Sequence, residues 1–374
     1  MLLWLLLLMS SARALSPSGF RSIVRVEQAP RLPVWPVVGG LVATALDLAK
    51  MKGAAAAVEE NVGGRVAPMS LSQEEADPFI LLVHHRHAFL PFDPIRPLFR
   101  LLLPERFPAH PHRGFETVTM TLKGGLKHRD SMGIKQEYAD GDVQWLTAGS
   151  GMLHEEMWLG EQCELYQLWL NLPKSAKMAK PSAIVLKNED HPIRKHGHDS
   201  REIRLDRSEE HDESVDAYPY VSKDYSPLDD EAATYLKTGP TRDDVRVSII
   251  QLDKENSNFT TSVPADATVL IYCRKGQVKV GDDPLDQYCL AYTERGTSNL
   301  KLTATKPNSE VLFLCGLPLR EPVAASGTWV VSNQAELVRA DADYKAGRLG
   351  VPWDHELSDT DWQKWVQDYA PKNF

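Results

Sequence analysis

Twelve histidines are unevenly distributed along this chain, and one group of them has the spacing of metal ligands. His110 and His112 stand two residues apart, and His154 and Glu156 repeat that spacing further along. Side chains two residues apart in a β-strand point to the same face, so each pair presents both side chains together. Two such pairs facing each other in a barrel would bring together three imidazoles and one carboxylate. Nitrogen and oxygen donors without a thiolate are typical of a first-row transition-metal site.

The residues around these two pairs are interpreted by the same alternation. Four protein ligands leave two octahedral positions for water, dioxygen or substrate. Glu155 lies one residue from each of His154 and Glu156, so its side chain is expected to point to the opposite face of the strand. Its replacement by glutamine is expected to leave metal affinity and activity nearly unchanged. Glu116 has the inward parity, and we interpret it as an acceptor that orients a ligand histidine. We expect His128 to point outward, and packing or surface roles for the histidines at 84, 85 and 87.

The elements that must position these residues are short strands separated by glycine-containing turns. Alternating or β-branched runs occur at 117–122, 143–146, 165–172 and 245–252, and further short runs follow up to residue 315. Regular short strands with turn signals between them predict an all-β sandwich or barrel. Helices are expected only at the periphery, at 41–60 and 334–347.

A weak internal repeat indicates two copies of one β-barrel. A Thr-Val pair at 117–118 stands eight residues before Gly125, and another at 268–269 stands eight residues before Gly276. Counting back from these pairs, Thr261 and Val263 replace the first histidine pair. The second copy is therefore expected to bind no metal.

The expected division of the chain follows from the motifs, the repeat and a highly charged stretch. It consists of 1–14, a signal segment; 15–59, a transit-like or helical extension; 60–186, an N-terminal metal-binding barrel; 187–243, a charged linker or excursion; 244–347, a C-terminal metal-free barrel; and 348–374, a tail expected to pack back on a domain.

Composition excludes several classes of protein. Hydrophobic residues make up 43% and charged residues 25%, as in ordinary globular proteins, which excludes collagen-like, disordered and polytopic membrane chains. The formal charge of −9 leaves no basic excess for a phosphate backbone, so we expect no direct binding to nucleic acid. The four cysteines form no Cys-x-x-Cys pair, which excludes zinc ribbons and thioredoxin-like redox motifs.

The amino terminus has features of an import signal. An apolar run at 1–9 is too short to span a membrane, and small residues at 12 and 14 fit a signal-peptidase site. The stretch at 15–26 has Ser and Arg and no acidic residue, which resembles a plastid transit segment. We expect entry into the secretory pathway or a plastid, with cytoplasm or nucleus as the alternative, and no transmembrane span in the mature chain.

Four segments resemble the pirin family, a branch of the cupin superfamily. They are His-Pro-His-Arg-Gly-Phe-Glu-Thr-Val at 110–118, the stretch from Gly-Asp-Val-Gln-Trp to His-Glu-Glu-Met at 141–157, Gly-Leu-Pro-Leu-Arg-Glu-Pro-Val at 316–323 and Asp-Pro-Phe-Ile-Leu-Leu at 77–82. The resemblance implies a bicupin, two double-stranded β-helix barrels with a few peripheral helices. It also implies Fe(2+) in the first barrel, with another divalent transition metal as the alternative.

The family's ligands, carried onto this chain, fall on His110, His112, His154 and Glu156. The resemblance implies a metal-dependent dioxygenase acting on a flavonol or other phenolic, like quercetin 2,3-dioxygenase. Glu156 would then also be the catalytic base. The alternative is a redox-sensing, metal-binding regulator of a protein partner that does not turn over substrate. We expect a small aromatic substrate and dioxygen as partners, and a monomer.

Overall fold

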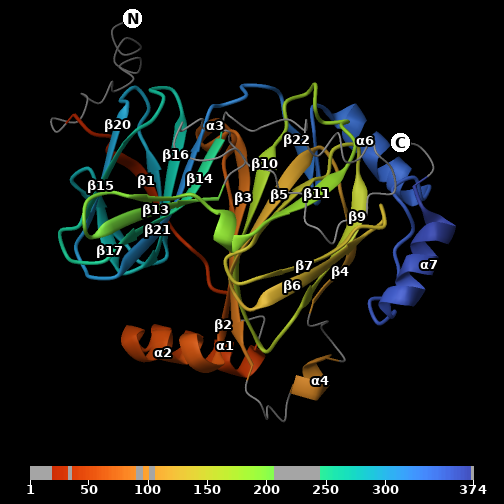
Figure 1. Cartoon of the computed structure of the whole chain (residues 1–374), viewed down its shortest axis with the longest axis horizontal. Helices are drawn as coiled ribbons and strands as arrows, with labels where there is room; N and C mark the ends of the chain where they lie inside the picture. Colours follow the sequence, from red (N-terminus) through yellow and green to blue (C-terminus); the bar gives the residue numbers. More distant parts are fainter. Residues whose placement is uncertain (1–18, 33–35, 90–95, 101–105, 206–244, 372–374) are drawn as a thin grey trace, which may run out of the picture. The chain divides into compact units, whose positions relative to one another are not determined.

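The computed structural model describes residues 19–32, 36–89, 96–100, 106–205 and 245–371 and divides into two compact units (Figure 1). The histidine unit comprises the described parts of Ala29–Pro192 and Leu319–Phe374, together with Leu205. The apolar unit comprises the described parts of Met1–Gln28, Ile193–Arg204 and Asp244–Pro318. Each unit contains a β-barrel built from two antiparallel sheets, so the expected bicupin fold is confirmed.

The barrel of the histidine unit has one large and one small sheet within the described residues. The large sheet has the order β11-β8-β5-β10-β3-β2, with β2 Gly64–Ser70, β3 Phe79–Ala88, β5 Phe115–Lys123, β8 Val143–Thr147, β10 Gln162–Asn171 and β11 Ser182–Leu186. The small sheet has the order β4-β9-β6-β7, with β4 Arg106–His112, β6 Gly125–Asp130, β7 Lys135–Ala139 and β9 Met152–Trp158. Both predicted ligand pairs therefore lie on neighbouring strands of the small sheet, β4 and β9.

Helices and a hairpin complete the histidine unit. They are α1 Val37–Leu48, α2 Lys52–Val62, α3 Gln73–Ala76, α4 Arg96–Arg100, η1 Asn188–Asp190, β22 Ala324–Ser326, β23 Trp329–Val331, α6 Gln334–Lys345 and α7 Asp359–Tyr369. The single helix predicted at 41–60 is two helices, because Lys50 between them has a φ of 61°, which an α-helix does not accommodate. The tail packs back as expected, since Trp353 and Trp362 belong to a buried cluster with Leu153 of β9.

The barrel of the apolar unit repeats the two-sheet arrangement. The larger sheet has the order β1-β19-β16-β21-β14-β13-β12, with β1 Ile23–Gln28, β12 Ile193–Lys195, β13 Ser200–Arg204, β14 Val245–Leu252, β16 Thr268–Lys275, β19 Cys289–Thr293 and β21 Ser309–Gly316. The smaller sheet has the order β15-β20-β17-β18, with β15 Asn258–Ser262, β17 Gln277–Val280, β18 Asp283–Asp286 and β20 Asn299–Ala304. Aliphatic and aromatic side chains from both sheets form its core, among them Ile271, Leu302 and Phe313.

The observed units divide the chain at other positions than the sequence analysis expected. Part of the segment expected to be transit-like belongs to the apolar unit: Arg21 is fully buried and donates to the carbonyl oxygens of Pro264 and Ala267. Two strands, β12 and β13, lie within the region expected to be a charged linker. The sequence analysis missed these additions because Arg21 and β13 find their partners far away along the chain, at 264–267 and in β14.

The segment expected to be a signal, 1–14, lies outside the described residues. In the part of the chain that the structure describes, no helix combines the length and apolar character needed to cross a membrane.

Candidate metal centre

Three of the four predicted ligands form a compact group in the histidine unit. In the antiparallel ladder between β4 and β9, His110 stands opposite His154, and His112 lies two residues further along β4. The ligating atoms of these three histidines all lie within 4.8 Å of one another, and the two Nε2 atoms of His110 and His154 are 3.1 Å apart. The two-residue spacing thus presents the imidazoles to one point, as the sequence analysis expected.

The protonation states of these imidazoles suit a metal ion. Burial lowers the pKa of His112 and His154 well below 6.5, and the neighbouring histidines lower it further. The pKa of His110 is also lowered by burial. His112 is 1% exposed, and neither of its ring nitrogens has a hydrogen-bond partner. A neutral, desolvated imidazole offers a lone pair to a transition metal, so the three residues fit such an ion.

Glu156 lies on the same strand as His154 but is held by other side chains. Its Oε1 accepts hydrogen bonds from Tyr138 Oη (3.0 Å) and Thr119 Oγ1 (3.4 Å), and its Oε2 accepts one from Gln167 Nε2 (3.0 Å). Burial, and then the charge of Glu156, raises the pKa of Tyr138 well above 10.0, so this phenol stays a proton donor. Glu156 is not in the compact group of three histidines, and its role as fourth ligand stays a prediction.

The sequence analysis did not identify the three residues that donate hydrogen bonds to Glu156. Tyr138, Thr119 and Gln167 come from β7, β5 and β10, which surround the barrel interior. The alternation of side chains marks the inward face of a single strand. It does not reveal which inward side chains of other strands will lie within hydrogen-bonding distance of Glu156. Glu116 accepts a hydrogen bond from Thr147 Oγ1 (2.8 Å), and its expected action on a ligand histidine stays a prediction.

His128 was expected to point outward, and this expectation is wrong. The residue is fully buried on β6, where it stands opposite Glu156 in the ladder with β9. Its Nδ1 lies 3.4 Å from Nδ1 of His154, and its Nε2 lies 3.0 Å from Oδ2 of Asp130. The alternation Leu126, His128, Asp130 on β6 carried the inward signal that would have identified it.

Glu155 points away from the histidines, but its surroundings differ from those expected. It is fully buried, its Oε1 accepts a hydrogen bond from Arg129 Nε (2.6 Å), and the indole N–H of Trp353 donates to the same oxygen. A buried carboxylate paired with arginine is costly to neutralise, because the arginine loses its buried charged partner. The expectation that Glu155→Gln is nearly silent is therefore not supported by this geometry.

Two further histidines contribute to the interior of the same unit. His85 and His87 are each 1% exposed, on β3, and His85 Nε2 lies 2.8 Å from His87 Nδ1. The ring of His85 stacks on Trp158 of β9 with centroids 4.8 Å apart, which joins the large sheet to the small one. Burial lowers the pKa of His87 to about 3, so the pair is uncharged at neutral pH.

The apolar unit carries no ligating side chains at the corresponding places. In the ladder between β15 and β20, Thr261 stands opposite Leu300, as His110 stands opposite His154. Val263 is 4% exposed and belongs to the apolar core. These residues occupy the positions at which the sequence repeat placed them, and none has a nitrogen or carboxylate donor.

Comparisons with known proteins agree with this architecture. The family described as Pirin matches residues 61–170, and the Pirin C-terminal cupin domain matches residues 250–350. The chain is 32% identical to the human protein Pirin over 78% of this chain and 90% of that one. It is 30% identical to Pirin-1 of Arabidopsis thaliana over 75% of this chain and 86% of that one. The crystal structure of quercetin 2,3-dioxygenase from Acinetobacter baumannii is similar with a TM-score of 0.64 and 26% identity, over 88% of this chain and 98% of that one.

Proposed function

The chain belongs to the pirin family, and on that premise we propose that it is a non-haem iron dioxygenase that acts on a flavonol or related phenolic. The observation that supports the proposal most directly is the group of three neutral histidines beside a carboxylate inside one barrel. The similarity to a quercetin 2,3-dioxygenase of known structure supports the choice of substrate class.

His110, His112 and His154 would hold the ion, with Glu156 as the fourth ligand. A divalent iron at this place would supply open coordination positions for dioxygen and for a phenolic oxygen. Nitrogen and oxygen donors also suit other first-row divalent metals, and we propose Fe(2+) because the family resemblance implies it.

Glu156, released in part from the ion, is the group that we propose to accept the proton of the substrate hydroxyl. Its three hydrogen-bond donors hold the carboxylate in one orientation, so that a lone pair can be directed at a bound hydroxyl. Tyr138 remains protonated and can donate to Oε1 of Glu156 both before proton transfer, when Glu156 is a carboxylate, and after it, when Glu156 is a carboxylic acid. Glu156 therefore serves as a base whose position is determined by its neighbours.

Aromatic side chains beside the histidines are consistent with a planar phenolic substrate. Phe107 stands opposite Glu156 in the strand ladder and is 38% exposed. Its ring packs edge-on against Trp158, with centroids 5.3 Å apart. Aromatic rings at a partly exposed position can stack on a flat ligand while the polar groups behind them bind its hydroxyls.

The test is oxygen uptake by protein loaded anaerobically with iron and then offered quercetin and a panel of phenolics. We expect uptake that depends on iron and substrate in the wild type and a loss of at least about 100-fold in Glu156→Gln. Iron binding without uptake on any phenolic would contradict the proposal and would favour a redox-sensing regulator.

We also propose that the chain is imported into the secretory pathway or a plastid. The burial of Arg21 limits a processing site to the residues before it, since cleavage after it would remove a side chain that binds the apolar unit. Amino-terminal sequencing of the mature protein tests this: we expect a start before residue 21, and an intact Met1 in the cytoplasm would contradict import.

A further inference from the structure

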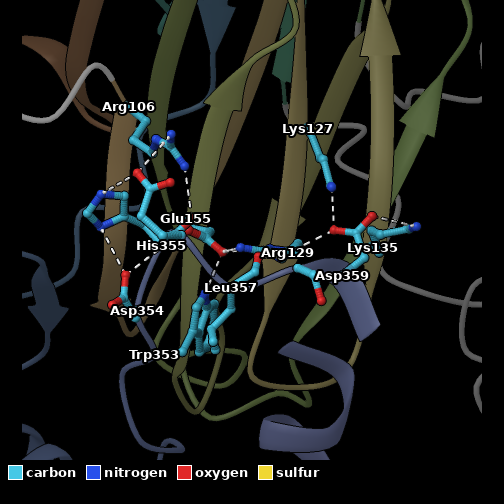
Figure 2. A network of polar contacts seen from close by, with 12 residues as sticks. Arg106, Lys127, Arg129, Lys135, Glu155, Trp353, Asp354, His355, Leu357 and Asp359 are labelled. Atoms are coloured by element: carbon cyan, nitrogen blue, oxygen red, sulfur yellow. Dashed lines mark hydrogen bonds and ion pairs between the residues drawn. The ribbon is translucent and has the colours of Figure 1, made fainter. Parts of the chain in front are cut away.

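The small sheet of the histidine unit has a second face, and one short segment covers it. The strands β4 and β9 carry the predicted ligands toward the barrel interior. The segment Trp353–Asp359, which we call the carboxyl-terminal brace, lies against the outer face of the same sheet (Figure 2). It leads into α7, whose Trp362 is 1% exposed.

The brace contacts all four strands of that sheet. On β4, Arg106 Nη1 donates to the carbonyl oxygen of His355 (2.9 Å). On β9, Glu155 accepts from the indole of Trp353, and on β6, Arg129 Nη1 donates to the carbonyl oxygen of Leu357 (2.9 Å). Lys127 of β6 and Lys135 of β7 complete the set through the carboxylate of Asp359.

Asp359 is the last residue of the brace and joins three cations from two strands. Its carboxylate pairs with Lys127 of β6 and with Lys135 Nζ of β7 (3.1 Å), and Arg129 Nη1 lies 3.3 Å from it (Figure 2). Burial of Asp359 opposes ionisation, but the hydrogen bonds from Lys127 and Lys135 outweigh it and lower the pKa of the carboxyl group. The brace is thus attached by charge at one end and by the Trp353–Glu155 contact at the other.

The attachment points alternate with the predicted ligands along the same strands. Glu155 lies between His154 and Glu156, and Arg129 stands directly opposite Glu155 in the ladder between β6 and β9. Glu155 is 0% and Arg129 1% exposed, so a change in their pairing has little free space in which to relax. Any shift of β9 that loosens Glu155 on one face must therefore move the two neighbouring side chains on the other.

We propose that docking of the carboxyl-terminal brace on the outer face and metal binding on the inner face are coupled, with Glu155 as the positioning residue. The proposal rests on the metal centre proposed above. The brace keeps β4 and β9 at the spacing that lets their histidines converge, and a metal bound between these strands favours the docked brace in return. Such coupling is reciprocal by thermodynamic necessity.

The first test uses full-length protein and Co(2+) as the probe. Asp359→Asn weakens the attachment of the brace without altering any barrel residue. Trp353→Phe keeps an aromatic ring but removes the indole N–H that donates to Glu155. We expect each variant to bind Co(2+) about tenfold more weakly in competition with a chelator and to show a changed visible absorption of the bound ion. Asp368→Asn, an exposed carboxylate on the same helix, is the matched control and should match the wild type.

The second test needs no brace variant and measures the reciprocal effect. Hydrogen exchange of the backbone amides in 353–369 should slow when Co(2+) is added to the wild type and should not respond in His110→Ala. If His110→Ala binds Co(2+) as tightly as the wild type, the metal centre itself is misplaced. If His110→Ala loses the ion while both brace variants keep wild-type affinity and absorption, or exchange in 353–369 ignores the ion, the coupling is refuted and the metal centre stands.

Discussion

The two barrels share a strand arrangement but line their interiors with opposite kinds of side chain. In the histidine unit β9 carries His154 and Glu156, whereas β20 of the apolar unit carries Leu300 and Leu302 in the matching ladder. The core of the apolar unit consists of aliphatic, aromatic and cysteine side chains. The same scaffold thus serves a packed core in one copy and a polar site in the other.

The difference also appears in unsatisfied polar atoms. Among the described residues of the histidine barrel, buried atoms without a hydrogen-bond partner include His85 Nδ1, His87 Nε2, both ring nitrogens of His112, and the hydroxyls of Thr117 and Thr121. Each such atom costs about 1–3 kcal/mol when left unpaired, so their concentration in one interior is consistent with a site built for a ligand. A barrel selected for packing alone would replace them; at the matching inward positions of the apolar unit stand Leu300, Leu302 and Val263.

The largest expected effect is loss of the metal from one barrel only. The double variant His110→Ala, His112→Ala should contain close to zero metal by elemental analysis while its circular dichroism stays native, because two of three imidazoles are gone. Thr261→Ala, at the matching position of the apolar unit, should keep the full wild-type content. One metal ion per chain in the double variant would mean that the metal site lies elsewhere and that these histidines do not distinguish the two barrels.

A change in the packing of the apolar core should lower the free energy of unfolding without changing metal binding. Phe313 is fully buried in that core, and its truncation to alanine should lower the free energy of unfolding by about 3–5 kcal/mol in denaturant titrations. The metal content of the folded variant should equal that of the wild type. A loss of less than 1 kcal/mol would show that this interior is not tightly packed.

Glu156 tests whether a carboxylate belongs to the metal site of the histidine unit. Glu156→Gln should weaken Co(2+) binding about tenfold, because the anionic ligand is lost while the volume is kept. Leu302→Met, at the matching position in the apolar unit, is a volume-conserving control and should leave the affinity unchanged. Equal affinity in Glu156→Gln would limit the site to the three histidines.

The smallest expected effect is a pH dependence that belongs to the histidine unit. The pKa of His87 is lowered from 6.5 to about 3 by burial, so the unfolded chain binds the proton first as pH falls. Its contribution is fully present above pH 6.5 and is lost progressively between pH 6.5 and about 3, with about 1 kcal/mol lost between pH 7 and 5.5. Unfolding of His87→Phe, measured beside the wild type, should show a correspondingly weaker dependence over that range. Parallel pH curves for the two proteins would contradict the assignment.

Much of the fold could be predicted because strands and turns leave local patterns. The range predicted at 245–252 coincides with β14, and that at 143–146 with β8 apart from its last residue. The helix at 41–60 was less well predicted, since a single residue with positive φ, Lys50, divides an otherwise helical composition. Of the site, the convergence of His110, His112 and His154 was predicted, but their neighbour His128 was placed on the wrong face.

The sequence alone determined which side chains of β4 and β9 share a face, because the two-residue period of a strand is a property of its backbone. It determined equally that Glu155 points the other way. Only the tertiary structure decided what Glu155 meets there: Trp353 lies 198 residues further along the chain. Only the tertiary structure assigned β1 to the apolar barrel, where it pairs with β19. Such contacts depend on which surfaces remain uncovered after the barrels form, and no local periodicity records that.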